Sequence, residues 1–332
     1  MAVKNKINWL LILQGWAMFC VVLGHSAPAA KIEDFPSYAL IIYYFCYSFH
    51  MPLFIAISGF LFYLTRINSN WTYLEMIKEK LVRFGIPFLV FTMVGMVLKS
   101  VFASSVDRPT TISLGELVNA ILYPGKGPFA EFWFLGTIIW FFVLSPVWKF
   151  FLGNKYLAIL LLIGLAILSP NHPKTEFLAL THVCKYAIYF FAGILCAMMY
   201  KKKASFITSL AIPVLFVAGG VIYAVGRLWH IPLMAPFGGI TFSLSLALLC
   251  ERIYPSLFVS FRNYTYQIYL LGIFFNVMVT IISAKFELPF VPMQILSLLL
   301  GLYMPVLISR VLQTLNFKPL LMCVGLKSKV KI

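Results

Sequence analysis

Apolar windows long enough to span a bilayer recur from one end of this chain to the other. Of its 332 residues, 62% are hydrophobic and only 11% are charged, whereas a soluble domain has about 25% charged residues. No tract is long and polar enough to form a separate soluble domain. The sequence therefore predicts an all-α polytopic membrane protein, with a single transmembrane domain over residues 1–332.

The apolar pattern predicts a bundle of about ten transmembrane helices. We expect them at about 7–27, 38–64, 84–104, 131–150, 155–170, 180–200, 205–226, 233–250, 262–284 and 289–312. Ten spans place both termini on one side, and the connections on that side, with a basic tail at about 313–332, carry most of the 26 Lys and Arg residues. The positive-inside rule then predicts cytoplasmic termini and a multi-pass protein of the cell (cytoplasmic) membrane.

The formal net charge of +16 does not indicate a nucleic-acid partner, because the basic residues lie in short connections between apolar segments. Membrane topology and anionic lipid headgroups explain such a distribution, so membrane lipids are the expected partners. The six cysteines form no C-x-x-C pair, and neither a disulfide framework nor a metal site is predicted. The first apolar run, after Lys4 and Lys6, is longer than a signal-peptide core, and we expect a retained first helix.

Three polar side chains interrupt the first two apolar runs. Gln14 lies inside the run WLLILQGWAMFCVVLGH, which ends in His25, and His50 precedes Pro52 in the second run. Such residues in spanning helices are costly unless they are paired or used, so all three are functional candidates. The alternatives are that Gln14 bonds a neighbouring helix, that His25 marks the membrane surface, and that His50 bonds a backbone carbonyl freed by Pro52.

Several stretches resemble the integral-membrane acyltransferase 3 family, which includes O-antigen and exopolysaccharide O-acetyltransferases. They are QGWA…VVLGH at 14–25, FHMPLF…SGFL at 49–61, KLVR at 80–83 followed by Ile86-Pro87, WFL at 133–135 and NYTYQIYL at 263–270. The chain departs from the family pattern at four positions. In the family's first-helix pattern D-x-x-R-G, the Asp and Arg positions are occupied here by Leu11 and Gln14. Lys80 replaces the first Arg of the basic pair, and Gly272 occupies a position where a late His is common.

The resemblance implies transfer of an acyl group, with acetyl as the expected group, from cytoplasmic acyl-CoA (acetyl-CoA) to a hydroxyl of a cell-surface or lipid-linked glycan, without a metal. Acyl transfer needs a base for the hydroxyl proton and a donor for the oxyanion. His25 matches the family histidine and is the expected base, since imidazole has an unperturbed pKa of about 6.5. His50 would orient His25 or bind the acceptor, and Gln14 would donate to the thioester carbonyl.

Two further groups of residues are assigned by the same resemblance. Arg83, with Lys80 and Arg66, would bind the coenzyme A phosphates, because guanidinium groups hold phosphate in a forked, charge-assisted way; lipid headgroup binding is the alternative. Glu131 and Trp133, beside the long connection 105–130, would meet the sugar acceptor; an ordinary aromatic belt is the alternative. With the donor cytoplasmic and His25 near the outer face, the pantetheine arm is expected to pass between helices.

Two other classes of protein fit the same residues. A transporter or flippase for a polysaccharide or lipid-linked glycan would use Gln14, His25 and His50 to line a substrate or proton path, without covalent chemistry. A structural membrane subunit would need none of them. The sequence leaves the oligomeric state open, with a homo-oligomer as one option.

Overall fold

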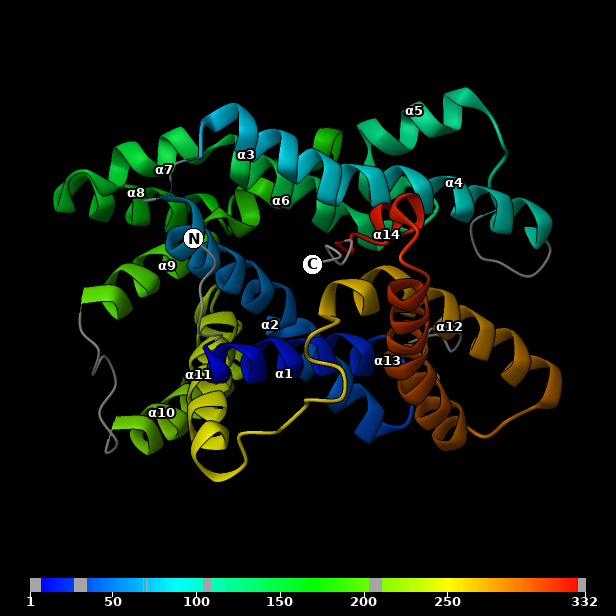
Figure 1. Cartoon of the computed structure of the whole chain (residues 1–332). Helices are drawn as coiled ribbons and strands as arrows, with labels where there is room; N and C mark the ends of the chain where they lie inside the picture. The colour runs from blue at the N-terminus through cyan, green and yellow to red at the C-terminus, as the bar shows by residue number, and fades with distance from the viewer. Residues whose placement is uncertain are drawn as a thin grey trace. The chain divides into compact units, whose positions relative to one another are not determined.

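The computed structural model describes residues 7–26, 35–67, 69, 71–103, 109–202 and 211–327 (Figure 1). Helices hold 82% of the described residues, and this part of the chain contains no strand. The predicted all-α fold class is therefore confirmed. Lys4, Lys6 and the last five residues of the predicted basic tail lie outside the described residues.

The helices follow one another with short connections, as the alternation of apolar runs and polar turns predicts. The α-helices are α1 (Asn8–Gly24), α2 (Ser37–Phe62), α3 (Tyr73–Lys80), α4 (Ile86–Val101), α5 (Leu114–Leu122), α6 (Trp133–Val143), α7 (Ser145–Leu152), α8 (Lys155–Leu168), α9 (Leu180–Lys202), α10 (Ala211–Leu228), α11 (Met234–Ile253), α12 (Thr265–Phe286), α13 (Phe290–Leu315) and α14 (Lys318–Cys323). Short segments of other helical type are the π-helices η2 (Tyr63–Ile67) and η3 (Leu81–Gly85), and the 3₁₀ turns η5 (Pro124–Lys126), η6 (Ala130–Phe132) and η7 (Phe177–Ala179).

Seven helical stretches of the described chain are long and apolar enough to cross a membrane. An eighth would be the pair Ala130–Val143 and Ser145–Leu152, which is bent by 51° at a break next to Pro146, a residue that lacks a backbone donor. Two shorter apolar helices are Asn8–Gly24 and Lys155–Leu168. A helix lies at each of the ten predicted positions, but the number of spans supported by length and composition is seven or eight, so ten spans and cytoplasmic termini stay predictions.

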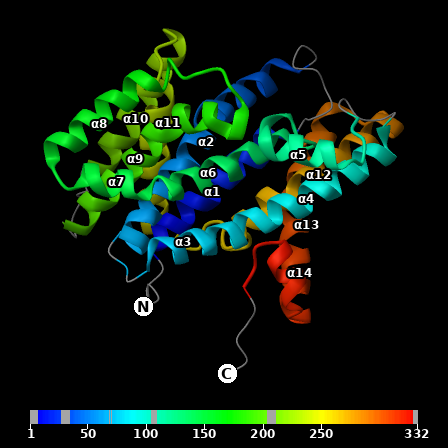
Figure 2. The same cartoon turned by 90° about the horizontal axis from the view of Figure 1, so that it is seen from above.

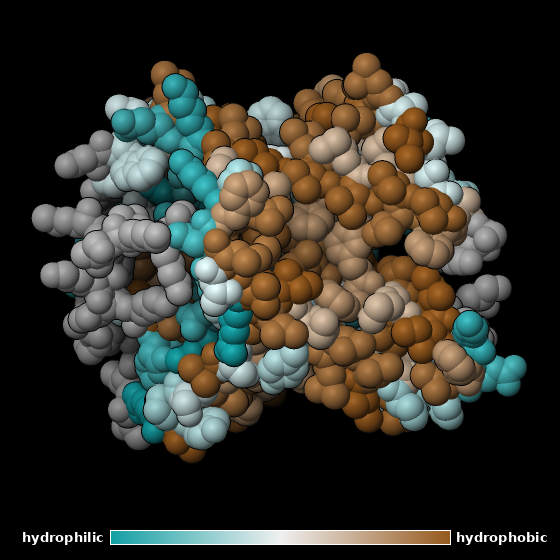
Figure 3. All heavy atoms as spheres, turned by 45° about the vertical axis from the view of Figure 1, so that its right-hand side comes forward, coloured by the Kyte–Doolittle hydropathy of each residue, from teal (hydrophilic) through white to brown (hydrophobic). Residues whose placement is uncertain are grey.

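Apolar side chains make up most of the molecular face in Figure 3, and hydrophilic side chains gather near its margins. Many large apolar side chains of the helices are exposed, among them Ile163, Val217 and Leu307. A soluble protein rarely leaves so much contiguous apolar surface in water. The chain is therefore a multi-pass membrane protein, whose apolar helix faces have lipid as their solvent.

The chain divides into two compact units. Unit 1 consists of Met1–Ile57 and Tyr200–Asn316, and unit 2 consists of Ser58–Met199 and Phe317–Ile332. Helix α2 begins in unit 1 and continues into unit 2 after Ile57. The single domain expected from the sequence stays a prediction.

In unit 1, α1 packs against α11, α12 and α13. One buried cluster joins α1 to α12 and α13, and it includes Met18, Val22, Ile268, Leu302 and Val306. At the other end of α1, a Glu251 carboxylate oxygen accepts a hydrogen bond of 2.9 Å from the backbone N–H of Trp9. That N–H has no partner within its own helix, and a negative charge is favourable at a helix N-terminus.

In unit 2, α3, η3 and α4 follow one another as a nearly continuous rod (Figure 2). The rod starts with a capping box, in which Thr72 and Glu75 each bond the backbone N–H of the other. Elsewhere in unit 2, α2 approaches the backbone of α9 so closely that a Cβ atom on Gly59 would overlap the carbonyl of Phe190. Gly59 therefore serves helix packing, as small residues do in membrane bundles.

Candidate functional site

The end of α1 in unit 1 brings the two predicted histidines together. His25 caps α1, and its ring centroid lies 6.2 Å from that of His50 on α2. The hydroxyl of Tyr47 lies 2.9 Å from Nδ1 and 3.3 Å from Nε2 of His25, and the Tyr47 ring lies 5.1 Å from each imidazole. His25 is half-buried, whereas His50 is buried. Two imidazoles and one phenol therefore form a single polar cluster.

His50 is held by its own helix. Its Nδ1 lies 2.6 Å from the carbonyl oxygen of Cys46, one turn earlier in α2. A ring that donates from Nδ1 to a carbonyl is left, when neutral, with Nε2 as its hydrogen-bond acceptor. The sequence-based alternative for His50 was a bond to a carbonyl freed by Pro52, which would be that of Ser48, four residues before the proline. The observed partner is Cys46 instead, so His50 does not compensate for the proline.

Asn276 of α12 ties the backbone of His25 to two other helices. Its side-chain amide donates a hydrogen bond of 3.2 Å to the carbonyl oxygen of His25, and its carbonyl oxygen accepts one of 3.1 Å from the hydroxyl of Ser297 on α13. Both Asn276 and Ser297 are buried. Sequence reasoning missed Asn276 and Tyr47, although an Asn inside an apolar helix is itself a signal of a paired or functional residue.

Gly272, one of the departures from the family pattern, has a structural explanation. A Cβ atom on Gly272 would lie 3.1 Å from the carbonyl oxygen of Gly301, and a Cβ on Gly301 would lie 2.7 Å from the side-chain oxygen of Asn276. The two glycines let α12 and α13 pack closely around Asn276. A side chain at position 272 would require the Gly301 carbonyl to move by a few tenths of an ångström, so this packing favours the glycine found there.

Gln14 does not join the histidine cluster. It precedes His25 by eleven residues on α1 and its continuation, which places it about 16 Å away along the helix axis. It is half-buried. Gln14 therefore cannot donate a hydrogen bond to an acyl group that His25 contacts, and the oxyanion role predicted for it does not fit the helix.

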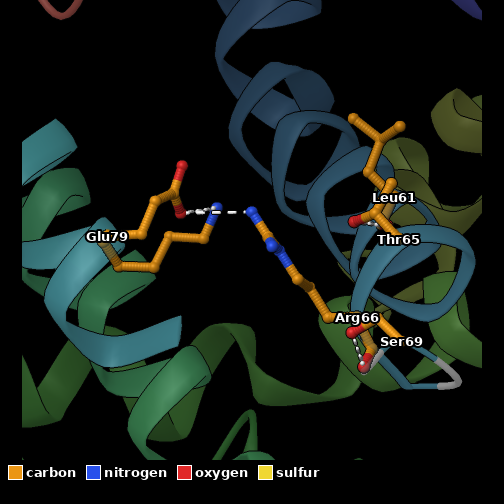
Figure 4. A network of polar contacts seen from close by, with 6 residues as sticks. Leu61, Thr65, Arg66, Ser69 and Glu79 are labelled. Carbon is orange, nitrogen blue, oxygen red and sulfur yellow. Dashed lines mark hydrogen bonds and ion pairs between the residues drawn. The ribbon is translucent and has the colours of Figure 1, made fainter. Parts of the chain in front are cut away.

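In unit 2, two of the three predicted cations meet at a carboxylate that sequence reasoning did not select. One oxygen of Glu79 lies 3.2 Å from an Arg66 guanidinium nitrogen and 3.1 Å from the ammonium nitrogen of Lys80. Figure 4 shows Arg66 and Glu79 facing each other from the ends of two different helices. The Arg66 guanidinium also lies 4.1 Å from the ring centre of Trp71, an arrangement typical of cation–π contacts.

The third cation, Arg83, is exposed and lies close enough to interact electrostatically with Glu79 and Lys80. Arg83 lies in the π-helix η3, and Arg66 lies in the π-helix η2. Single π-helical turns are rare and are frequent at functional sites. With three cations and one carboxylate, the cluster keeps a net positive charge and can attract an anion.

Trp133 begins α6, and Glu131 lies just before it in η6, half-buried. The indole of Trp133 lies parallel to two rings of α9: its centroid is 4.0 Å from that of His182 and 5.2 Å from that of Tyr186. Sequence reasoning did not assign a role to His182. Among the described residues, no three His, Cys, Asp or Glu side chains group closely enough to hold a metal ion.

Taken together, the apolar helices and the histidine cluster define a multi-pass membrane protein with a polar site at the end of its first helix. The family model described as acyltransferase domain matches residues 7–310. The chain therefore belongs to the acyltransferase 3 family. No curated protein and no solved structure matches it.

Proposed function

We propose that this protein is a membrane O-acyltransferase that moves an acyl group from acyl-CoA to a hydroxyl of a cell-surface or lipid-linked glycan. Acetyl is the acyl group that we favour. The observation that carries the proposal is the cluster of His25, Tyr47 and His50 within the matched acyltransferase domain. A neutral imidazole held by a hydroxyl is suited to general-base chemistry. The cell membrane, with both termini cytoplasmic, remains the proposed location.

In this reaction His25 takes the proton of the acceptor hydroxyl while the hydroxyl oxygen attacks the thioester carbon. The carbon–sulfur bond then breaks, and the leaving coenzyme A thiolate receives the proton from the imidazolium of His25, so that the base is regenerated. The hydroxyl of Tyr47, which lies within hydrogen-bond distance of Nδ1, orients the His25 ring. His50, whose Nε2 is the acceptor when the ring is neutral, would bind a second hydroxyl of the acceptor.

The cluster of Arg66, Lys80 and Arg83 is the proposed site for the coenzyme A phosphates. Support comes from its net positive charge and from the π-helical turns that carry both arginines. A phosphate would replace the Glu79 carboxylate as the partner of Arg66 and Lys80, with the forked geometry that guanidinium favours. Glu131 and Trp133 are the proposed contacts of the sugar acceptor.

The test is label transfer with the purified protein in lipid nanodiscs. Acetyl-CoA labelled in the acetyl group is incubated with a panel of bacterial surface glycans, and the glycan is separated and counted. We expect label in at least one glycan, together with release of free coenzyme A. If the protein moves an unmodified lipid-linked glycan across a vesicle membrane and no label enters any glycan, it is a transporter and the proposal is wrong.

A further inference from the structure

Two buried polar atoms in unit 2 lie outside the sites described above. They are Oε2 of Glu176, just before η7, and Nδ1 of His182, in the first turn of α9. Neither atom has a hydrogen-bond partner within the described part of the chain. Buried polar atoms are nearly always paired, and an unpaired one costs free energy. Two such atoms near one another indicate a place where a ligand supplies the missing partners.

Both side chains border the same point in space, above Gly125. A Cβ atom placed on Gly125 would lie 3.7 Å from Oε2 of Glu176 and 4.0 Å from Cε1 of His182. Gly125 belongs to η5, in the turn-rich connection before α6. Two segments about fifty residues apart in the sequence therefore meet here, and a side chain at position 125 would contact both the carboxylate and the imidazole.

Parallel aromatic rings, here called the aromatic wall, lie next to this place, because His182 belongs to both. The rings of Trp133, His182 and Tyr186 are parallel within 14°. Aromatic rings are the usual platforms for flat, amphipathic ligands, because they offer a large apolar area at a low cost in conformational entropy. The wall and the two orphaned polar atoms share His182, so the apolar and polar parts of the site are adjacent.

The backbone that presents Glu176 is strained. Leu178 and Ala179 have φ values of 49° and 60°, a left-handed conformation that costs non-glycine residues free energy and concentrates at functional sites. The indole N–H of Trp140 holds this turn through a hydrogen bond of 2.9 Å to the carbonyl oxygen of Leu178. The fold thus keeps a costly turn directly after the carboxylate that borders Gly125.

We propose that Glu176, His182 and Trp133 form a binding site for a pyranose ring with free hydroxyl groups. One sugar hydroxyl would donate to Oε2 of Glu176, a hydroxyl would bond Nδ1 of His182, and the apolar face of the ring would lie against the aromatic wall. The carboxylate disfavours a phosphate or another anion. The inference rests on the proposed function, for which it adds two residues that recognise a sugar of the acceptor glycan.

The experiment measures sugar binding directly, by saturation-transfer NMR with the full-length protein in nanodiscs. The probes are methyl glycosides of glucose, galactose, mannose, rhamnose and N-acetylglucosamine, with cyclohexylmethanol as a hydroxyl-poor control. We expect at least one glycoside to bind and the control not to compete. The Glu176→Gln and His182→Phe variants should each raise the Kd about tenfold, as expected when one hydrogen bond to a charged or buried partner is lost.

A variant that fills the site tests the geometry without removing a polar group. Gly125→Ala adds a methyl group at ordinary contact distance from its neighbours, so we expect a folded protein with sugar binding weakened about tenfold. Gly164→Ala in α8 is the matched control, because its added Cβ meets no atom within 4 Å, and it should bind sugar as the wild type does. Absence of glycoside binding in the wild type, or equal binding by all variants, would overturn the proposal.

The outcomes separate this inference from the proposed function. If the wild type acylates a glycan and the Glu176→Gln and Gly125→Ala variants leave the KM for the glycan unchanged, the sugar site is wrong and the acyltransferase stands. If glycosides bind through these residues and no label is transferred from acetyl-CoA, the site stands and the acyltransferase is wrong. A raised KM for the glycan, with kcat and the KM for acetyl-CoA unchanged, supports both.

Discussion

The histidine cluster of unit 1 and the cation cluster of unit 2 are held in opposite ways. His25 is held by uncharged groups, the hydroxyl of Tyr47 and the amide of Asn276, whereas Arg66 and Lys80 are held by the full charge of Glu79. The Tyr47 hydroxyl orients the imidazole and Asn276 holds the backbone of His25, and neither adds a charge next to the ring, which suits the proposed role as a base. The Glu79 carboxylate partly neutralises Arg66 and Lys80, and a phosphate with more negative charge could replace it.

The comparison predicts that loss of the base has the largest effect. His25→Ala should lower kcat for acyl transfer about 10²- to 10⁴-fold, the usual contribution of a general base, with little change in the KM for acetyl-CoA. Label transfer by equal amounts of purified protein measures the effect. His230→Ala, at an exposed position in the turn after α10, is the control and should keep wild-type activity. Normal turnover by His25→Ala would remove the imidazole from the chemistry.

Loss of the exposed cation should act on the donor rather than on the chemistry. Arg83→Ala should raise the KM for acetyl-CoA about tenfold or more, because a charge-assisted contact to phosphate is lost, and should leave the KM for the glycan unchanged. Initial rates at varied concentrations of each substrate separate the two constants. An equal rise in both would mean that Arg83 acts on the structure of unit 2 and not on the donor.

Asn276 tests whether neutral hydrogen bonds position the base. Asn276→Leu removes the bonds to the His25 carbonyl and to Ser297, and we expect kcat to fall about tenfold, since small displacements of a catalytic group are costly. A merely structural role would lower thermal stability and leave the activity per folded protein unchanged. Thermal unfolding in nanodiscs, together with the rate per folded molecule, distinguishes the two.

The smallest effect, of opposite sign, is expected from Glu79→Gln. Without its charge the side chain no longer competes with phosphate for Arg66 and Lys80, so the KM for acetyl-CoA should fall a few-fold, by about the modest free energy of a partly exposed ion pair. Added salt should weaken donor binding more steeply in the variant, because the cluster carries one more unit of positive charge. A raised KM would show instead that Glu79 is needed to keep the cations in place.

Helix positions were predictable because they depend on local hydrophobicity. A spanning helix needs an apolar run long enough to cross the hydrocarbon core of the bilayer, and such runs can be found in the sequence. The pairing of His25 with His50 was predicted as a shared function, and the structure places the two rings side by side. Gln14 was grouped with them because it lies in the same apolar run, but the rise of a helix separates residues 14 and 25. The number of spans was harder to predict, because α1 and α8 are short and because the chain bends between α6 and α7.

The residues that sequence reasoning missed lie far along the chain from their partners. Asn276 meets a carbonyl 251 positions away, and Glu79 meets Arg66 only because two helix ends converge. Glu176 and His182 meet at Gly125 because of a strained turn that no local propensity predicts. Hydrogen bonds and ion pairs act over a few ångströms, so only packing decides which polar side chains they join.

The amino-acid order alone determined that this protein lies in a membrane as helices. That property follows from the free energy of transferring each segment from water to lipid, which is a sum over neighbouring residues. The tertiary structure decided which donors hold His25, which carboxylate neutralises the cations, and where two buried atoms lack partners. These depend on the close approach of helices at glycines such as Gly59 and Gly301, a geometric condition that no single segment contains.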